Sequence, residues 1–153
     1  MIDFNIMKRA SIYRYMDNLV FVPCGFIENG PIISIEPIVH LNISSPDKEL
    51  GTTLLSTLNF SQKVTSSLKE SSLVFKRLLQ ISKAKSSKKL VQNGQFVVAH
   101  LKEDSIKLEL FQSDIKHKGF SPRKERQIIE MELQGLSDME LGQTIRQMFN
   151  VKS

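Results

Sequence analysis

Apolar and β-branched residues dominate the first forty positions and predict two strands. The stretch from Ile12 to Val22 is typical of a strand, with a possible turn at Asp17-Asn18 inside it. The tetrapeptide Glu28-Asn29-Gly30-Pro31 is a strong turn signal and leads into a second strand from Ile32 to Val39. We therefore expect a hairpin, with Pro37 at a sheet edge or bulge because proline cannot donate a ladder hydrogen bond.

The spacing changes after Ser44 and predicts helices. Ser45 can cap a helix, Pro46 suits its first position, and leucines follow at helical intervals at 50, 54, 55 and 58 before Asn59 ends the pattern. A less regular apolar pattern predicts a second helix over 66–82. The polar, basic segment from Ser82 to Lys89 is expected to be a loop.

Alternation returns in the last third of the chain. It predicts a hairpin of two strands, 95–101 and 106–111, joined by a turn over 102–105. Gly119-Phe120-Ser121-Pro122 is expected to break the chain. The segment 123–133 fits a further strand or, alternatively, a short helix, and 137–149 fits a final helix.

An internal repeat suggests how these elements are organised. Residues 47–54 (DKELGTTL) resemble residues 138–145 (DMELGQTI), and the match continues at Leu58-Asn59 and Phe149-Asn150. A glycine inside both helices costs stability against alanine, so we expect both helices to pack closely on the sheet at Gly51 and Gly142. The pattern predicts an α+β fold with a mostly antiparallel sheet. We expect one domain over 1–153 with two similar meander-plus-helix halves, about 1–61 and 90–153, joined by a basic helical segment.

Composition is ordinary for a globular protein of 153 residues, with 41% hydrophobic and 24% charged residues. Cys24 is the only cysteine, which rules out an intrachain disulfide and suits a reducing compartment. No apolar run is long enough for a signal peptide core or a membrane span. We expect a cytoplasmic protein that does not use the membrane as a partner.

The net charge of +5 is concentrated between Lys63 and Lys89, where eight basic residues face one acid, Glu70. Such a run can neutralise phosphates, so a small basic nucleic-acid-binding protein is an alternative function. Phe75 is the one aromatic residue nearby, and stacking platforms need more. A solvated surface is therefore favoured, and direct nucleic-acid binding is disfavoured.

Residues that could carry catalysis lie far apart in the sequence. His40, His100 and His117 lack metal-like partners at two to five residues, and Cys24 has no neighbouring histidine or acid pair. Three pairs of acids have ordinary explanations. Glu103 and Asp104 lie in a turn, Glu130 and Glu132 share the solvent face of a strand, and Asp138 and Glu140 suit the dipole at the start of a helix. No phosphate loop or nucleophile motif is present. We expect no enzyme, no catalytic residue, no metal, no cofactor and no small-molecule substrate, with an enzyme using Cys24 or a histidine as a remaining alternative.

Several segments together resemble the immunity proteins of contact-dependent growth inhibition (CDI), the CdiI family. They are Ile35-Glu36-Pro37-Ile38-Val39, Asp47-Lys48-Glu49-Leu50-Gly51, Ser61, Ser87-Lys88-Lys89-Leu90, Phe96-Val97-Val98, Ile106-Lys107-Leu108, Gly119-Phe120 and Ser137-Asp138-Met139-Glu140-Leu141-Gly142. Their order and spacing fit nearly the whole chain. Two features depart from the family: Lys88 stands where relatives often have an aromatic residue, and the basic charge does not suit a nucleic-acid mimic.

The resemblance implies a stoichiometric inhibitor that binds the C-terminal toxin domain, often a nuclease, of a cognate CDI exoprotein. It also implies that a toxin hairpin can extend a sheet of the immunity protein by β-augmentation. From the sequence, the hairpin over 96–111 is our first candidate for the exposed edge. The alternative is a well-covered hairpin in the core, because natural sheets commonly protect their edges. The expected toxin-binding residues are Lys102, Glu103, Asp104, Lys107, Glu109 and Phe111.

Overall fold

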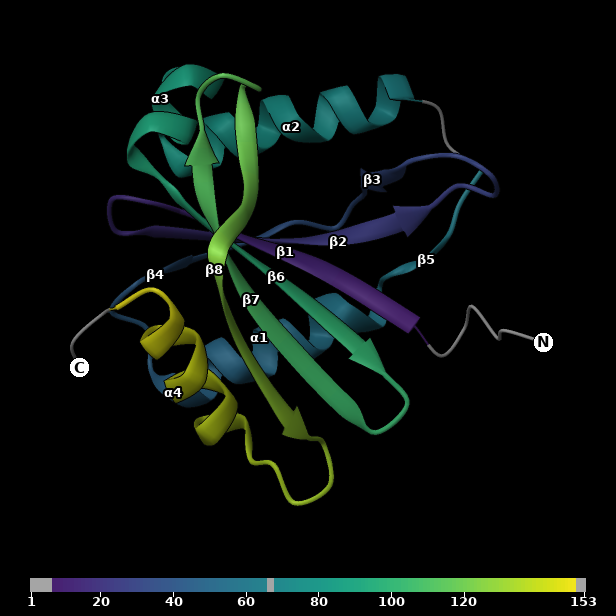
Figure 1. Cartoon of the computed structure of the whole chain (residues 1–153), viewed down its shortest axis with the longest axis vertical. Helices are drawn as coiled ribbons and strands as arrows, with labels where there is room; N and C mark the ends of the chain where they lie inside the picture. Colours follow the sequence, from purple (N-terminus) through teal and green to yellow (C-terminus); the bar gives the residue numbers. More distant parts are fainter. Residues whose placement is uncertain (1–6, 66–67, 151–153) are drawn as a thin grey trace.

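A computed structural model describes residues 7–65 and 68–150, and Figure 1 shows its arrangement. Within these residues the chain forms eight strands and four helices, which confirms the α+β class. The elements of the first half are β1 (Met7–Tyr15), β2 (Asn18–Phe26), β3 (Ile32–Ser34), β4 (Val39–Asn42), α1 (Asp47–Asn59) and β5 (Gln62–Lys63). They are followed by α2 (Leu68–Ser82), α3 (Ser87–Asn93), β6 (Gln95–Lys102), β7 (Ser105–Asp114), β8 (Gly119–Glu132) and α4 (Asp138–Met148).

The strands form one sheet in the order β3-β2-β1-β6-β7-β8, with β4 and β5 also pairing with β2. The central pair, β1 and β6, is antiparallel and places Ala10 opposite Ala99. On one side of this pair β1 leads to β2, β3, β4 and α1, and on the other β6 leads to β7, β8 and α4.

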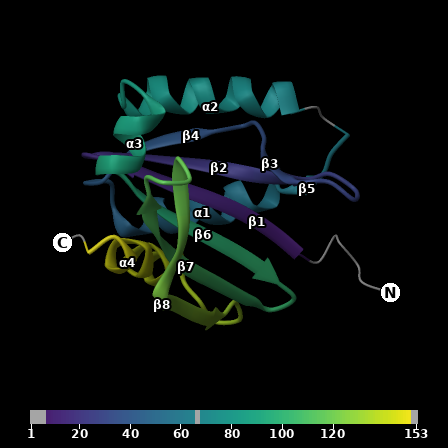
Figure 2. The ribbon, with the colours of Figure 1, turned by 45° about the horizontal axis from the view of Figure 1, so that its top comes forward.

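Helices cover both faces of the sheet, as Figure 2 shows for α2 on one side of β2 and α1 with α4 on the other. The larger core lies under α1 and α4 and includes Ile12, Phe21, Leu54, Leu108 and Ile145, all fully buried. A smaller core packs α2 and α3 on β2, where Val20, Val22, Val74, Leu78, Ala84 and Leu90 meet. Burial of these apolar side chains is the main stabilising contribution to the fold.

The repeated glycines pack one helix on the other helix. A Cβ atom at Gly51 in α1 would lie 1.9 Å from the carbonyl oxygen of Asp138, and one at Gly142 in α4 would lie 1.7 Å from that of Asp47. The expectation that these glycines approach the sheet is wrong. Glycine is needed because each helix backbone touches the first turn of its partner, and no side chain fits there.

Several element boundaries differ from the sequence prediction. The possible turn within the first predicted strand is present one residue earlier than expected, at Met16-Asp17, where Met16 takes a positive φ of 54°, and it divides the stretch into β1 and β2. The predicted strand from Ile32 to Val39 is interrupted between β3 and β4, where the Glu36-Pro37 peptide is cis. The hairpin turn itself is confirmed, since β2 and β3 pair on either side of it.

Three further local predictions are corrected. Pro46 is the N-cap of α1 and no side chain caps this helix, so Ser45 does not act as the expected cap. The last residues of the predicted basic loop begin α3, where the Ser86 hydroxyl accepts a hydrogen bond from the Lys89 amide. The segment 119–122 does not break the chain. It begins β8, which favours the strand over the helix alternative.

The remaining helix predictions hold. α1 ends at Asn59 as expected, and α4 begins after Ser137, whose hydroxyl accepts a hydrogen bond from the Glu140 amide. α2 ends at Ser82, and positions 66–67 of its predicted start lie outside the described residues. None of the helices in the described part of the chain is both long enough and apolar enough to cross a membrane.

Candidate partner-binding face

The sheet face on the α2 side carries four rows of side chains that run across β1, β6 and β7. The first row is aromatic and consists of Tyr13, Phe96 and Phe111. Next comes a buried row of Ser11, Val98 and Glu109, then a cationic row of Arg9, His100 and Lys107, and last Met7, Lys102 and Ser105. Because side chains alternate between the two faces of a strand, these twelve residues share one surface.

The aromatic row closes one end of this surface. The rings of Phe96 and Phe111 meet edge to face with centroids 5.4 Å apart, and Phe96 also stacks on Phe120 of β8 at 5.2 Å. Tyr13 lies 4.7 Å from Phe96. Phe111, one of the predicted toxin-binding residues, is thus half-buried inside an aromatic cluster. Its ring packs on Phe96 of β6, within a cluster whose rings come from four strands.

Glu109, another predicted binding residue, is buried at 3% exposure. Its carboxylate accepts two hydrogen bonds from the Arg126 guanidinium of β8, one of them 2.6 Å long. This pairing raises the pKa of Arg126. A bidentate pair of this kind satisfies a carboxylate that would otherwise be costly to bury. Glu109 therefore faces Arg126 in the free protein.

The cationic row contains two unpartnered nitrogens. Arg9 Nε and His100 Nδ1 are buried and make no hydrogen bond, although the three side chains of the row are each partly exposed. Neither Arg9 nor Lys107 forms an ion pair with any described residue. Burial, together with the charges of Arg9 and Lys107, lowers the pKa of His100 to about 4, against a smaller opposite effect of Glu109. His100 is neutral at pH 7.

Cys24 and Tyr13 lie beside this row and are both protonated. Burial raises the pKa of the Cys24 thiol, whose Sγ lies 3.7 Å from the Ser11 hydroxyl, and Arg9 opposes the shift. Burial likewise raises the pKa of Tyr13. A thiol is nucleophilic as its thiolate, so this environment disfavours Cys24 as a nucleophile.

The other predicted binding residues lie at the β6–β7 turn. Lys102, Glu103 and Asp104 are exposed there, and Glu103 has a positive φ of 55°. Lys107 lies within the cationic row. The structure thus brings Lys102 and Lys107 onto one face but leaves Glu103 and Asp104 at its rim. Sequence reasoning missed Arg9 and His100, because register alone places these residues beside Lys107.

The β6–β7 hairpin is not a sheet edge, so the expectation that it offers one is wrong. β6 is flanked by β1 and β7, and β7 is flanked by β6 and β8. The outer side of β8 is unpaired within the described residues. A run of charged residues, Arg123 to Arg126, lies in this edge strand, and charges at an edge discourage indiscriminate pairing.

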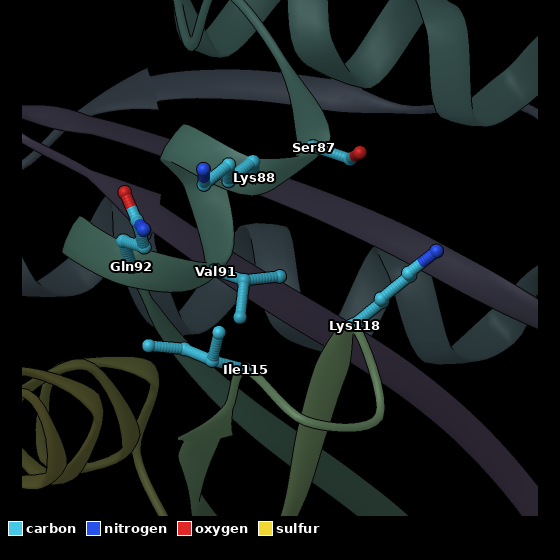
Figure 3. A pocket seen from close by; sticks show the side chains of 6 residues that line it. All are labelled: Ser87, Lys88, Val91, Gln92, Ile115 and Lys118. Carbon is cyan, nitrogen blue, oxygen red and sulfur yellow. The ribbon is translucent and has the colours of Figure 1, made fainter.

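The basic segment lies on α2 and α3. Lys76, Lys83 and Lys85 line one shallow hollow of about 410 Å³, together with Leu79, Gln80 and Ala84. Arg77 of the same segment pairs with Glu36. Lys88 lines a second pocket, of about 300 Å³, where Val91 of α3 and Ile115 of the β7–β8 turn face each other (Figure 3). Both hollows lie away from the cationic row.

The histidines do not form a metal site within the described residues, since no group of three potential metal ligands is found there. His40 hydrogen-bonds Asn18 at 2.8 Å, and His117 hydrogen-bonds Asp114 at 2.9 Å. Both are exposed. The hydrogen bonds with His117 lower the pKa of Asp114.

No protein-family model matches the sequence, and no curated protein is significantly similar to it. Solved structures do match. A protein of unknown function from Neisseria meningitidis has a TM-score of 0.75 at 15% identity, with 99% of each chain covered. A chain of the CdiA-CT/CdiI toxin and immunity complex from Yersinia pseudotuberculosis has a TM-score of 0.76 at 12% identity, with 95% of this chain and 98% of that chain covered. At these identities the likeness establishes a shared fold.

Proposed function

We propose that the chain is a CDI immunity protein that binds and neutralises the C-terminal toxin domain of a cognate exoprotein. The fold match over almost the full length of a chain from a CdiA-CT/CdiI complex carries this proposal. The motif resemblance of the sequence to CdiI proteins supports it independently. The protein acts in the cytoplasm of the producing cell, without catalysis, and its toxin is a nuclease.

The surface chemistry fits a binding protein. The face on the α2 side contains two buried nitrogens, Arg9 Nε and His100 Nδ1, that make no hydrogen bond within the described residues, next to an aromatic cluster and a charged rim. Buried polar groups without partners are costly, so a protein keeps them where a ligand or partner uses them. Charges matched across an interface select one partner and repel others.

If the toxin extends the sheet, it pairs with the outer side of β8 and not with the predicted β6–β7 hairpin. β8 is 14 residues long and is unpaired on that side among the described residues. Main-chain hydrogen bonds from an added strand would supply affinity, and the charges at 123–126 would select the partner.

Co-expression tests the proposed function. Cells that express the toxin domain encoded immediately upstream should survive when this chain is present and die when it is absent. A matched control expresses an unrelated CDI toxin with this chain, and those cells should die. Death of cells that carry both cognate genes would refute the immunity role.

The lysines of α2 and of the segment between α2 and α3 support nucleic-acid binding as a second candidate function. Lys76, Lys83 and Lys85 share one hollow, so phosphates could contact several of them at once. Gel-shift assays over a salt series distinguish this function, because phosphate contacts make the affinity fall steeply with salt. Absence of a shift at low salt would remove this candidate.

A further inference from the structure

Arg9, His100 and Lys107 stand next to one another across three strands, in register on one face. His100 is directly opposite both Arg9 and Lys107, and residues in such positions have Cβ atoms about 4.5–5.5 Å apart. Arg9 and Lys107 flank a neutral imidazole, and neither forms an ion pair with a described residue. The two cations therefore disfavour a positive charge on His100 in the free protein.

Two acids, Glu109 and Glu130, face this row, and neither forms an ion pair with it. Glu109 is bound by Arg126, and its effect on His100 is the smallest of the four causes of the His100 shift. Glu130 of β8 is opposite Lys107 in register but forms no ion pair with it, and its side chain is exposed. From the other neighbours, Tyr13 and Cys24 contribute neutral groups, and Lys102 adds one more positive charge.

The row can nevertheless be reached from solvent. Arg9, His100 and Lys107 are each partly exposed, while Arg9 Nε and His100 Nδ1 are buried and unpartnered. A carboxylate is the group that matches this chemistry. It accepts hydrogen bonds from a guanidinium in a planar, bidentate geometry and from an ammonium as a point charge. A neutral partner would leave the two cations uncompensated.

We infer that the cationic row of Arg9, His100 and Lys107 receives an aspartate or glutamate side chain of the protein partner. The identity of that partner as a CDI toxin rests on the proposed function, whereas the acceptance of a carboxylate rests on the row itself. Binding adds a charge-assisted contact from each of the two cations. It also favours the protonated form of His100, which can then donate to the same carboxylate.

A titration of the full chain with a blocked tetra-glutamate peptide tests the site without the toxin. Two-dimensional NMR of the histidine ring nitrogens should show the pKa of His100 rising by at least one unit when the peptide is saturating. A blocked tetra-glutamine peptide is the neutral control and should leave His100 unchanged. An unchanged His100, or an equal response to both peptides, would overturn the inference.

Variants that each remove one positive charge test whether the peptide binds at the cationic row. Arg9→Gln and Lys107→Gln should each weaken peptide binding at least fivefold, whereas Lys48→Gln, an equal charge change at an exposed position of α1, should not. Lys107→Gln should leave the free protein about as stable as the wild type, because Lys107 is partly exposed and forms no ion pair there. If Lys48→Gln weakens peptide binding as much as the other two substitutions, net charge alone attracts the peptide, and the proposed carboxylate site is refuted.

The same variants, measured against the toxin domain encoded upstream, separate the two proposals. We expect Arg9→Gln and Lys107→Gln to weaken toxin binding at least tenfold and Lys48→Gln to have no effect. Toxin that binds all four proteins equally would refute the inference and leave the immunity function standing. A wild-type chain that responds to the glutamate peptide but binds no toxin would refute the proposed function and support the carboxylate site.

Discussion

The backbone of Gly51 in α1 lies directly against the carbonyl group of Asp138 in α4, so close that a Cβ atom would be 1.9 Å from its oxygen. The reverse contact, Gly142 against Asp47, is equally close at 1.7 Å. The two helices therefore cross where each one begins, and each supplies the glycine that the other requires. This reciprocal contact explains why the same pattern of residues occurs twice in the chain.

Gly51→Ala should destabilise the protein by about 2 kcal/mol. Alanine improves helix propensity by about 1 kcal/mol, but overpacking against a backbone carbonyl costs about 3 kcal/mol. Urea denaturation followed by circular dichroism measures the difference. Ser56→Ala, at an exposed position of the same helix, is the control and should be neutral or slightly stabilising. A stabilised Gly51→Ala variant would show that the helices separate easily.

Arg146 breaks the symmetry between the halves and joins α4 to the start of α1. Its guanidinium donates to the carbonyl oxygens of Ile43 and Ser45 at 2.7 and 2.6 Å and to the Asp47 carboxylate at 2.8 Å. The equivalent position in α1 is Leu55, which cannot make such bonds. Arg146 of α4 thus stabilises the start of α1, and the repeat contains no corresponding contact in the other direction.

Arg146→Met should destabilise the protein by about 3–5 kcal/mol, because it leaves Asp47 and two carbonyls without their partner. Arg146→Lys should recover only part of the loss, since an ammonium lacks the planar fork of a guanidinium. Thermal and urea unfolding measure both variants. Gln147→Met, at the next and exposed position, should change stability by less than about 0.5 kcal/mol. A small loss for Arg146→Met would contradict a structural role.

Ser137→Ala should cost about 1 kcal/mol, the usual loss for a capping serine. The hydroxyl of Ser137 accepts a hydrogen bond from the Glu140 amide at 3.1 Å and donates to the Glu140 carboxylate, also at 3.1 Å. Ser45→Ala is the matched variant in the other repeat and should cost nothing, since no side chain caps α1. Equal losses from the two substitutions, measured by urea unfolding, would contradict this assignment of the caps.

Ser45 and Ser137 show which features of the two helices could be predicted from the sequence repeat and which could not. The repeat located both helices, but Ser45 stands one residue too early, and Pro46 occupies the capping position. The pattern could not show this, because capping depends on the backbone angles of a single residue. Similarly, the repeated glycines indicated close packing, but not whether a helix or the sheet approaches them.

Only part of the candidate site could be predicted from the sequence. Lys102 and Lys107 could be singled out because they flank a recognisable hairpin, and both lie on the proposed face. Arg9 is about ninety residues away from His100 in the sequence, and only the β1–β6 register places the two side by side. Likewise, the hairpin could be predicted from alternation, but its interior place in the sheet depends on β1 and β8 pairing at its two sides.

The depressed pKa of His100 predicts how stability changes with pH. Burial, Arg9 and Lys107 hold the pKa at about 4 in the native protein, whereas an unfolded chain has a histidine pKa near 6.5. Between these values the unfolded state binds a proton that the native state does not. Native stability should therefore fall as the pH is lowered from about 6.5 towards 4, and His100 should have no effect above pH 7.

Urea unfolding at pH 7 and pH 5 tests this prediction, because most carboxylates keep their charge over that interval. The wild type should lose more unfolding free energy than His100→Gln, which cannot bind the extra proton. His40→Gln, which alters an exposed histidine with no comparable burial, should lose as much as the wild type. If His100→Gln and the wild type have the same pH dependence, His100 is not held neutral by its neighbours. Arg9 and Lys107 would then not act on His100 as neighbouring positive charges, and the row would lose one argument for an acidic partner.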